Sequence, residues 1–267
     1  MENEKTEPAD TKPEIGLANP EWKTPIWEAK YSQLIRILRY SEMKALFGSL
    51  DVEDQGRFRV NLGISSDDLA LWLQALLFTG MRLSELWKFR EHPELLQRNN
   101  TILLAREIFY DSGKKKQTAQ ERVVQLSDMG IKVVNAFLQS ARMPRMPFTT
   151  TATAIDHILE QTALKLRFQT RVFKYRQRER LPSGKFAYTY RDHETTGIRI
   201  RSFRKSWDSW LVNTFGSDPM RMDMIMLSQG HNHATSLSHY LTFGLDYDDK
   251  QDIKKAMKGY GGWEFKE

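Results

Sequence analysis

Residues 65–86 read SSDDLALWLQALLFTGMRLSEL and decide the local fold of this chain. Ser65 and Asp68 stand three positions apart, which is the spacing of a capping box at the start of a helix. Four leucines follow at helical spacing on one face: Leu69, Leu73, Leu76 and Leu77. Gly80 is expected to end this helix, because a residue without a side chain best tolerates the left-handed cap conformation. Arg82 is therefore predicted to lie at a corner between two helices.

Two runs of strand-forming residues follow this corner, at about 101–110 and 121–126. The segment between them contains Gly113 and the lysine run Lys114, Lys115 and Lys116. This arrangement predicts an antiparallel hairpin with a lysine-rich tip. Helical patterns of apolar residues are expected at about 31–50, 128–141, 151–168, 202–213, 219–227, 234–243 and 248–258.

A basic and aromatic insert is expected at about residues 169–200. Between residues 165 and 205 the chain has thirteen Lys or Arg against three acids, with five Phe or Tyr interleaved between residues 173 and 190. The Leu-Pro-Ser-Gly sequence at 181–184 predicts a turn between two strands. The simplest role of such a hairpin is to contact phosphates and sugars of DNA. The cations expected to do so are Arg171, Lys174, Arg176, Arg178, Arg180, Lys185 and Arg199.

The composition excludes several classes of protein. The chain has no cysteine, which excludes disulfides, thiolate catalysis and cysteine-based metal sites. Its formal net charge is +6 and its pI is about 9.3, which together indicate a polyanionic partner. The sequence has neither an apolar signal core nor an apolar run of the ~18 residues that a bilayer span requires. We therefore expect a soluble, cytoplasmic protein with no membrane partner.

Four short contexts carry the candidate chemistry. They are Thr79-Gly80-Met81-Arg82-Leu83-Ser84-Glu85-Leu86, then Arg201-Ser202-Phe203-Arg204, then Gly230-His231, and finally Tyr240, which stands nine positions after His231. Their order and spacing resemble the active-site signature of the tyrosine recombinase family, the phage integrases and their cellular relatives. The resemblance covers roughly residues 41–267. It implies a mainly α fold with a small antiparallel β-sheet (α+β) and a DNA integration or recombination activity.

The resemblance gives the reaction a nucleophile and a phosphate clamp. Tyr240 would attack phosphorus to form a 3′-phosphotyrosyl intermediate, which stores the bond energy for religation. Arg82 and Arg204 would clamp the non-bridging oxygens, because a guanidinium donates two parallel hydrogen bonds and keeps its proton. Glu85, close to one helical turn after Arg82, would orient that arginine. His231 would hydrogen-bond the scissile phosphate.

The resemblance also implies a proton donor to the leaving 5′ oxygen. Lys114 matches the family's hairpin lysine because it follows Gly113. The loop before residue 121 is longer than usual in the family, so Lys115 and Lys116 are alternatives. No cofactor and no metal ion are implied, since His231 and the two later histidines have no carboxylate partner at a recognised ligand spacing.

Arg201 departs from the family pattern, which usually has His at this position. At ordinary pH an arginine cannot act as a general base. Arg201 would therefore hydrogen-bond the phosphate while another group accepts the proton, or it would contact the DNA backbone nearby. This departure keeps two alternatives to a recombinase open. One is DNA relaxation like that of a type IB topoisomerase, and the other is a catalytically inactive DNA-binding regulator on the same fold.

The implied domain organisation is a catalytic domain at residues 41–267 that contains the basic insert. Residues 1–40 are read as a polar tail with four prolines followed by the first helix, and they do not supply the N-terminal helical domain usual in the family. A truncated protein, a compact natural variant and a recombinase that needs a helper all remain open.

The resemblance further implies partners and a location. The expected partner is double-stranded DNA, bound by a homo-oligomer that assembles as a tetramer on DNA and associates with the nucleoid. In the family a C-terminal helix docks on a neighbouring subunit. The helix expected at 248–258 would either do this or fold back on its own core.

Overall fold

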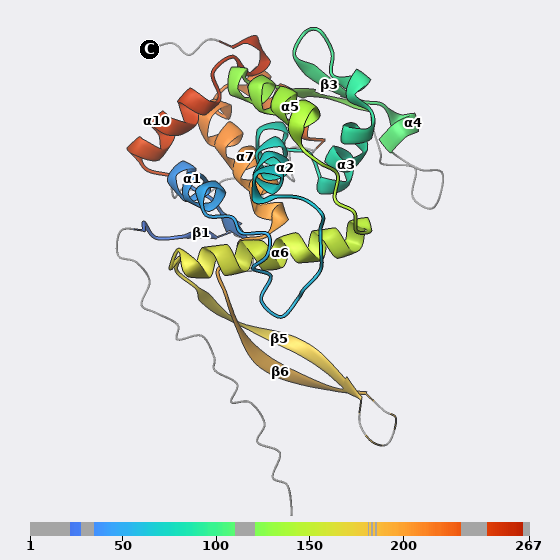
Figure 1. Cartoon of the computed structure of the whole chain (residues 1–267). Coiled ribbons are helices and arrows are strands. Elements are labelled where there is room, and N and C mark those ends of the chain that lie inside the picture. The colour runs from blue at the N-terminus through green and yellow to red at the C-terminus, as the bar shows by residue number, and fades with distance from the viewer. Residues whose placement is uncertain are drawn as a thin grey trace, which may run out of the picture.

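The computed structural model describes residues 22–27, 35–109, 121–180, 182, 184, 186–230 and 245–263. Within these ranges the chain is mainly helical and has three two-stranded antiparallel sheets (Figure 1), so it belongs to the α+β class. The helices are α1 (Tyr40–Gly48), α2 (Ser66–Thr79), α3 (Leu83–Glu91), α4 (Arg106–Phe109), α5 (Asp128–Ser140), α6 (Phe148–Lys165), α7 (Ile200–Phe215), α8 (Pro219–Gln229) and α10 (Tyr247–Ala256), with short 3-10 helices at Pro93–Leu95 and Tyr260–Gly262. The strands pair as β1 (Ile26–Trp27) with β2 (Arg36–Ile37), β3 (Thr101–Leu104) with β4 (Arg122–Gln125), and β5 (Arg171–Arg180) with β6 (Phe186–Thr195).

Helix α2 lies at the centre of the helical body, between α5 and α7 (Figure 1). Its capping box forms as the sequence predicted, because Ser65 Oγ accepts from the backbone N–H of Asp68 at 3.1 Å and Asp68 Oδ2 accepts from that of Ser65 at 2.9 Å. Gly80 ends the helix in the left-handed conformation, with a φ of 60°. Each buried leucine of this helix would cost about 2–5 kcal/mol of stability if it were cut back to alanine.

The first helix is shorter than predicted. Residues 35–39 are extended, and α1 begins only at Tyr40. The backbone N–H of Arg39 donates to Glu42 Oε2 at 3.0 Å, so Glu42 caps the helix at this point. Arg36 lies fully buried in β2 and pairs with Glu42, an arrangement that helical periodicity alone does not reveal. Residues 31–34 of the predicted helix lie outside the described ranges.

The predicted strand at 101–110 is also shorter, because β3 ends at Leu104 and residues 106–109 form the one-turn helix α4. Leu104 pairs with Arg122, the first residue of β4, so the strand ends where its partner strand begins. The predicted lysine-rich tip at 110–120 lies outside the described residues.

Four of the predicted helices are present with shifted ends, namely those at 128–141, 151–168, 202–213 and 219–227. The helix predicted at 234–243 lies outside the described residues.

The basic insert forms a hairpin as predicted. Strands β5 and β6 pair over ten residues each, from Arg171 opposite Thr195 to Arg180 opposite Phe186. Figure 1 shows this two-stranded ribbon extending away from the helical body, beyond α6. Its base contacts the body, where Phe173 is buried against Trp27.

Helix α10 folds back on its own core, which decides between the two alternatives for the C-terminal helix. Ile253, Ala256 and Met257 are all buried, and the helix packs against α1, α5 and α7. Tyr260 follows it into the core and contacts Trp207 edge-on, with the ring centroids 5.8 Å apart. The apolar face of α10 is therefore occupied within the same chain.

Candidate functional site

Glu85 is the centre of a cluster of charged side chains. It lies on the first turn of α3, and its Oε2 accepts from the backbone N–H of Arg82 at 2.7 Å, which caps the helix. Its Oε1 accepts from Arg82 Nη1 at 2.7 Å. The side chain of Glu85 is only 5% exposed, whereas that of Arg82 is 52% exposed. A buried carboxylate therefore holds one end of a guanidinium that reaches the surface.

Arg204 reaches the same carboxylate from α7. Its Nη1 lies 3.7 Å from Glu85 Oε2 and donates to the carbonyl of Gly80 at 2.7 Å. Its Nη2 donates to the carbonyl of Gln229 at 2.6 Å. These two carbonyls lie at the C-terminal ends of α2 and α8, where carbonyls lack helical partners and the helix dipole favours a cation. Two helix ends thus fix the orientation of the Arg204 guanidinium.

Arg122 is a third arginine of this cluster and was not predicted from the sequence as a member of the site. It is the first residue of β4, and its Nη2 donates to Glu85 Oε2 at 2.8 Å. Its side chain is 5% exposed, as is that of Glu85. A Cβ added to Gly230, the left-handed C-cap of α8, would come within 2.7 Å of Arg122 Nη1. The end of α8 therefore lies close to this guanidinium, and a side chain at residue 230 would displace it.

The three guanidiniums determine the charge state of Glu85. Burial raises the pKa of its carboxyl, but Arg122, Arg204 and Arg82 lower it by more, so the net shift is downward. Glu85 is therefore ionised at neutral pH. Asp208, also buried, lies 3.8 Å from Arg204 Nε. Three cations thus face two carboxyl groups, and the most exposed of the five side chains is that of Arg82.

The structure brings some of the predicted site residues together. Arg82, Glu85 and Arg204 converge, although Arg204 lies far from the other two in the sequence. Arg201 is exposed on the first turn of α7. The remaining predicted members of the site lie outside the described residues: Lys114, Lys115, Lys116, His231 and Tyr240.

The predicted DNA-contacting cations are distributed between the ribbon and the body. Arg199 is half-buried at the start of α7, where its Nη1 donates to the carbonyl of Asp156 at 3.4 Å and its Nη2 lies 3.9 Å from Glu160. It therefore links α7 to α6. Arg171 lies over the ring of Trp27, 5.6 Å from its centroid, at the base of the ribbon. Lys174 and Arg180 are exposed on β5.

Three further cations were predicted in the ribbon: Arg176, Arg178 and Lys185. Arg176 and Arg178 belong to β5, where their backbones pair with those of Tyr190 and Tyr188. Lys185 lies outside the described residues.

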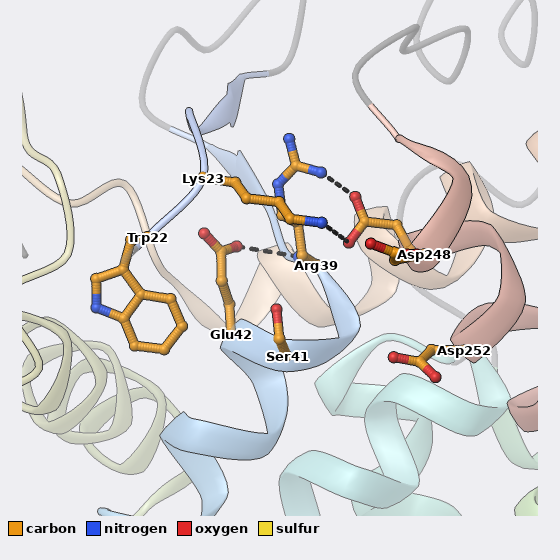
Figure 2. Close-up of a pocket in the computed structure, with 8 residues that line it drawn as sticks. Trp22, Lys23, Arg39, Ser41, Glu42, Asp248 and Asp252 are labelled. Carbon is orange, nitrogen blue, oxygen red and sulfur yellow. Dashed lines mark hydrogen bonds and ion pairs between the residues drawn. The ribbon is translucent and has the colours of Figure 1, made fainter. Parts of the chain in front are cut away.

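A pocket of about 410 Å³ lies elsewhere, between the segment at 22–23, α1 and α10 (Figure 2). Several of its charged groups form ion pairs. Arg39 forms an ion pair with Asp249, and Lys23 lies 4.0 Å from the same carboxylate. Lys23 also donates to Asp246 at 2.6 Å and thereby lowers the pKa of Asp246 to about 2. The pocket thus holds a network that fastens the N-terminal segment to α10.

Comparisons of the chain with models of protein families, with curated proteins and with solved structures found no match. Among the described residues, no helix has both the length and the apolar character needed to cross a bilayer. In the same part of the chain, no group of three or more His, Cys, Asp or Glu side chains is placed to hold a metal ion.

Proposed function

We propose that this chain is a site-specific DNA recombinase that cleaves and rejoins duplex DNA through a 3′-phosphotyrosyl intermediate on Tyr240. The observation that carries the proposal is the convergence of Arg82, Arg122 and Arg204 on the buried carboxylate of Glu85. Phosphoryl transfer depends mainly on positioned charges around the phosphate, which such a cluster supplies.

The three arginines differ in how far their contacts bury them, and this difference supports anion binding. Arg204 and Arg122 are held by carbonyls and by Glu85, whereas Arg82 is bound to Glu85 at one end and is 52% exposed. A network that served stability alone would gain little from an arginine that projects into water, because exposed ion pairs contribute about 0–1 kcal/mol. A held but exposed guanidinium is instead suited to donate two hydrogen bonds to a phosphate.

The proposed reaction has a defined balance of bonds and protons. The phenolic oxygen of Tyr240 bonds to phosphorus as the bond from phosphorus to the 5′ oxygen breaks, while Arg82 and Arg204 neutralise the non-bridging oxygens. The leaving 5′ oxygen takes a proton from a hairpin lysine, for which Lys114 is the first candidate. The phenol also loses a proton. Arg201 has no lone pair to accept it, so the acceptor is another group or solvent.

A duplex with a nick close to the cleavage point tests the proposal, because loss of the short released strand traps the covalent intermediate. We expect a protein–DNA adduct that survives denaturation, that is absent with Tyr240→Phe and that is strongly reduced with Arg82→Gln. Tyr247→Phe is the matched control, since Tyr247 is exposed on α10 away from the arginine cluster, and it should form as much adduct as the unmodified chain.

Two outcomes would contradict the proposal. DNA binding without any adduct would indicate the inactive regulator. An adduct accompanied by relaxation of supercoiled DNA without sequence preference would indicate the topoisomerase activity.

A further inference from the structure

The two faces of the β5–β6 ribbon carry different side chains. Side chains alternate between faces along a strand, so residues two apart share a face with their paired partners. The register pairs Lys174 with Asp192 and Arg180 with Phe186, and it pairs positions 178 and 176 with Tyr188 and Tyr190. One face therefore carries a row of aromatic residues on β6 opposite the basic positions 174, 176, 178 and 180 on β5.

The aromatic residues of this face are open to solvent. Phe186, Tyr188 and Tyr190 are 50%, 51% and 70% exposed. The intervening residues Ala187 and Thr189, which belong to the other face, are less exposed. At the base of the ribbon the other face turns toward the body, because Phe173 is buried there while the adjacent Val172 is exposed. We call the face with residues 174, 180, 186, 188 and 190 the outer face of the ribbon.

The charged residues beside these exposed aromatic residues indicate which kind of partner the outer face suits. Lys174 and Arg180 frame the row, and the register positions between them are also basic. On this face of the register, the four basic positions of β5 outnumber the two acidic residues, Asp192 and Glu194. A surface with a net positive charge repels another copy of itself and attracts a polyanion. Aromatic residues beside cations are the combination that binds single-stranded nucleic acid, in which bases stack on the rings while the cations follow the phosphates.

The spacing of the rings favours an unpaired strand over a duplex. Residues two apart on a strand lie about 6.8 Å apart. In a stacked duplex each strand advances only about 3.4 Å per nucleotide, and both faces of every base are already covered by its neighbours. Rings at this spacing can take successive bases only where the bases are unstacked and spread apart.

We propose that the outer face of the ribbon binds an unpaired DNA strand, with bases stacked on Phe186, Tyr188 and Tyr190 and phosphates held by Lys174 and Arg180. The inference rests on the proposed function for the identity of the nucleic acid as DNA. Strand exchange also provides a reason for such a site, because a cleaved strand with a free 5′ end must separate from its complement before it joins a new partner. The ribbon projects from the body, so a strand on it lies beside the helical domain rather than within it (Figure 1).

The test measures equilibrium binding by fluorescence anisotropy with three probes: a fully paired duplex, the same duplex with a central unpaired bubble of about ten nucleotides, and a thymidine oligonucleotide. All variants carry Tyr240→Phe, so that no adduct forms and the result does not depend on cleavage. We expect Tyr190→Ala and Tyr188→Ala each to weaken binding to the bubble and the oligonucleotide about tenfold, and binding to the paired duplex less than about twofold.

Matched variants separate the contribution of the aromatic ring to binding from the contributions of the tyrosine hydroxyl and of the neighbouring charges. Tyr190→Phe keeps the ring and should bind all probes within about twofold of the parent. Lys174→Gln should weaken all three probes and make binding less dependent on salt, because it removes a phosphate contact. Arg191→Gln removes an exposed cation from the opposite face of the same ribbon and should have a smaller effect than Lys174→Gln.

Three results would overturn this inference. Equal losses on the bubble and on the paired duplex would mean that the tyrosines contact duplex DNA. Unchanged binding to every probe in Tyr188→Ala/Tyr190→Ala would mean that the ribbon does not bind DNA. A dimer of the parent that the double variant dissociates, measured by sedimentation, would make the outer face an interface between copies. Failure of adduct formation with bubble binding intact would sink the proposed function and leave the ribbon site standing.

Discussion

Replacing Glu85 by glutamine should destabilise the protein strongly, because it removes a buried negative charge that lies within 3.7 Å of all three arginines of the cluster. The carboxylate accepts from the backbone N–H of Arg82 at 2.7 Å, from Arg82 Nη1 at 2.7 Å and from Arg122 Nη2 at 2.8 Å. Glutamine has nearly the same shape but offers one acceptor oxygen and turns an N–H donor toward the guanidiniums. Arg122, which is 5% exposed, then remains a buried charge without its partner.

The magnitude follows from the burial of each pair. Removing one partner of a buried ion pair costs about 3–5 kcal/mol, which applies to the pair of Glu85 with Arg122. The pair with Arg82 is half exposed and adds at most about 1 kcal/mol. We expect a loss of about 3–5 kcal/mol in the free energy of unfolding, measured by urea denaturation as a lower midpoint with an unchanged slope. Glu91→Gln, at the exposed end of α3, is the control and should change stability by less than about 0.5 kcal/mol.

The effect of Glu85→Gln should also depend on pH. The folded-state pKa of Glu85 is lowered, so its contribution to stability is fully present above its unfolded pKa of about 4.3 and is lost as the pH falls through the folded value. The stability gap between the parent and Glu85→Gln should therefore narrow in acid, below about pH 4. A gap that stays constant down to pH 3, or a loss below about 1 kcal/mol at pH 7, would refute the assignment of Glu85 as the charged centre of the cluster.

Three further predictions concern other parts of the chain. Gly230→Ala should lower the free energy of unfolding, measured by urea denaturation, by about 1–2 kcal/mol or more. Gly230 has a φ of 66°, and a Cβ there would meet Arg122 Nη1 at 2.7 Å. Gly262→Ala is the control and should cost less, because Gly262 has a φ of 73° but a Cβ there would meet no such contact. Lys23→Gln should move the pKa of Asp246 upward from about 2, measured by carboxyl NMR titration, and should lower stability by less than about 1 kcal/mol because the pair is exposed. Tyr260→Phe should lower the free energy of unfolding by about 1 kcal/mol, measured by thermal or urea denaturation, since it removes a buried hydroxyl 3.3 Å from Ser228 Oγ. In the unmodified chain this tyrosine should stay protonated until about pH 12, because burial raises its pKa to about 12.

The parts of the fold that the sequence predicted are those with local causes. The helix from Ser66 follows from a capping box, an apolar stripe and a C-terminal glycine, and all three lie within sixteen residues. The ribbon follows from a turn signal between two runs of strand formers. In both cases each element carries the signals for its own start and end, so that no knowledge of distant residues is needed.

The parts that the sequence missed depend on partners far away in the chain. The helix predicted at 31–50 has apolar residues at roughly helical spacing, yet residues 35–38 are extended and buried against other elements. The backbone N–H of Leu38 donates to Ser206 Oγ on α7, and that of Arg36 donates to the carbonyl of Gly197. Such contacts override local helical preference and leave no periodic signal.

The candidate site likewise contains residues with a local sequence signal and one residue without such a signal. Glu85 was expected to orient Arg82 because the two are close to one helical turn apart, and the structure places its carboxylate on Arg82. Arg122 had no such signal, since an arginine at the start of a strand after a polar loop is usually exposed. Its role depends on Glu85 and on Gly230, which are distant in sequence.

Arg122 also links separate elements of the fold at the cluster. It begins β4, the strand that follows the lysine-containing segment, and it donates to Glu85 on α3. A Cβ added at Gly230, immediately before His231 in the sequence, would lie 2.7 Å from it. The hairpin, the first arginine and the end of α8 are therefore coupled through one buried guanidinium. In the proposed reaction, which depends on placing cations around a phosphate within a fraction of an ångström, such coupling would matter more than the stability that it contributes. Under the proposed function, this coupling gives a use at this position to a buried ion network, which is often no more stable than an apolar core.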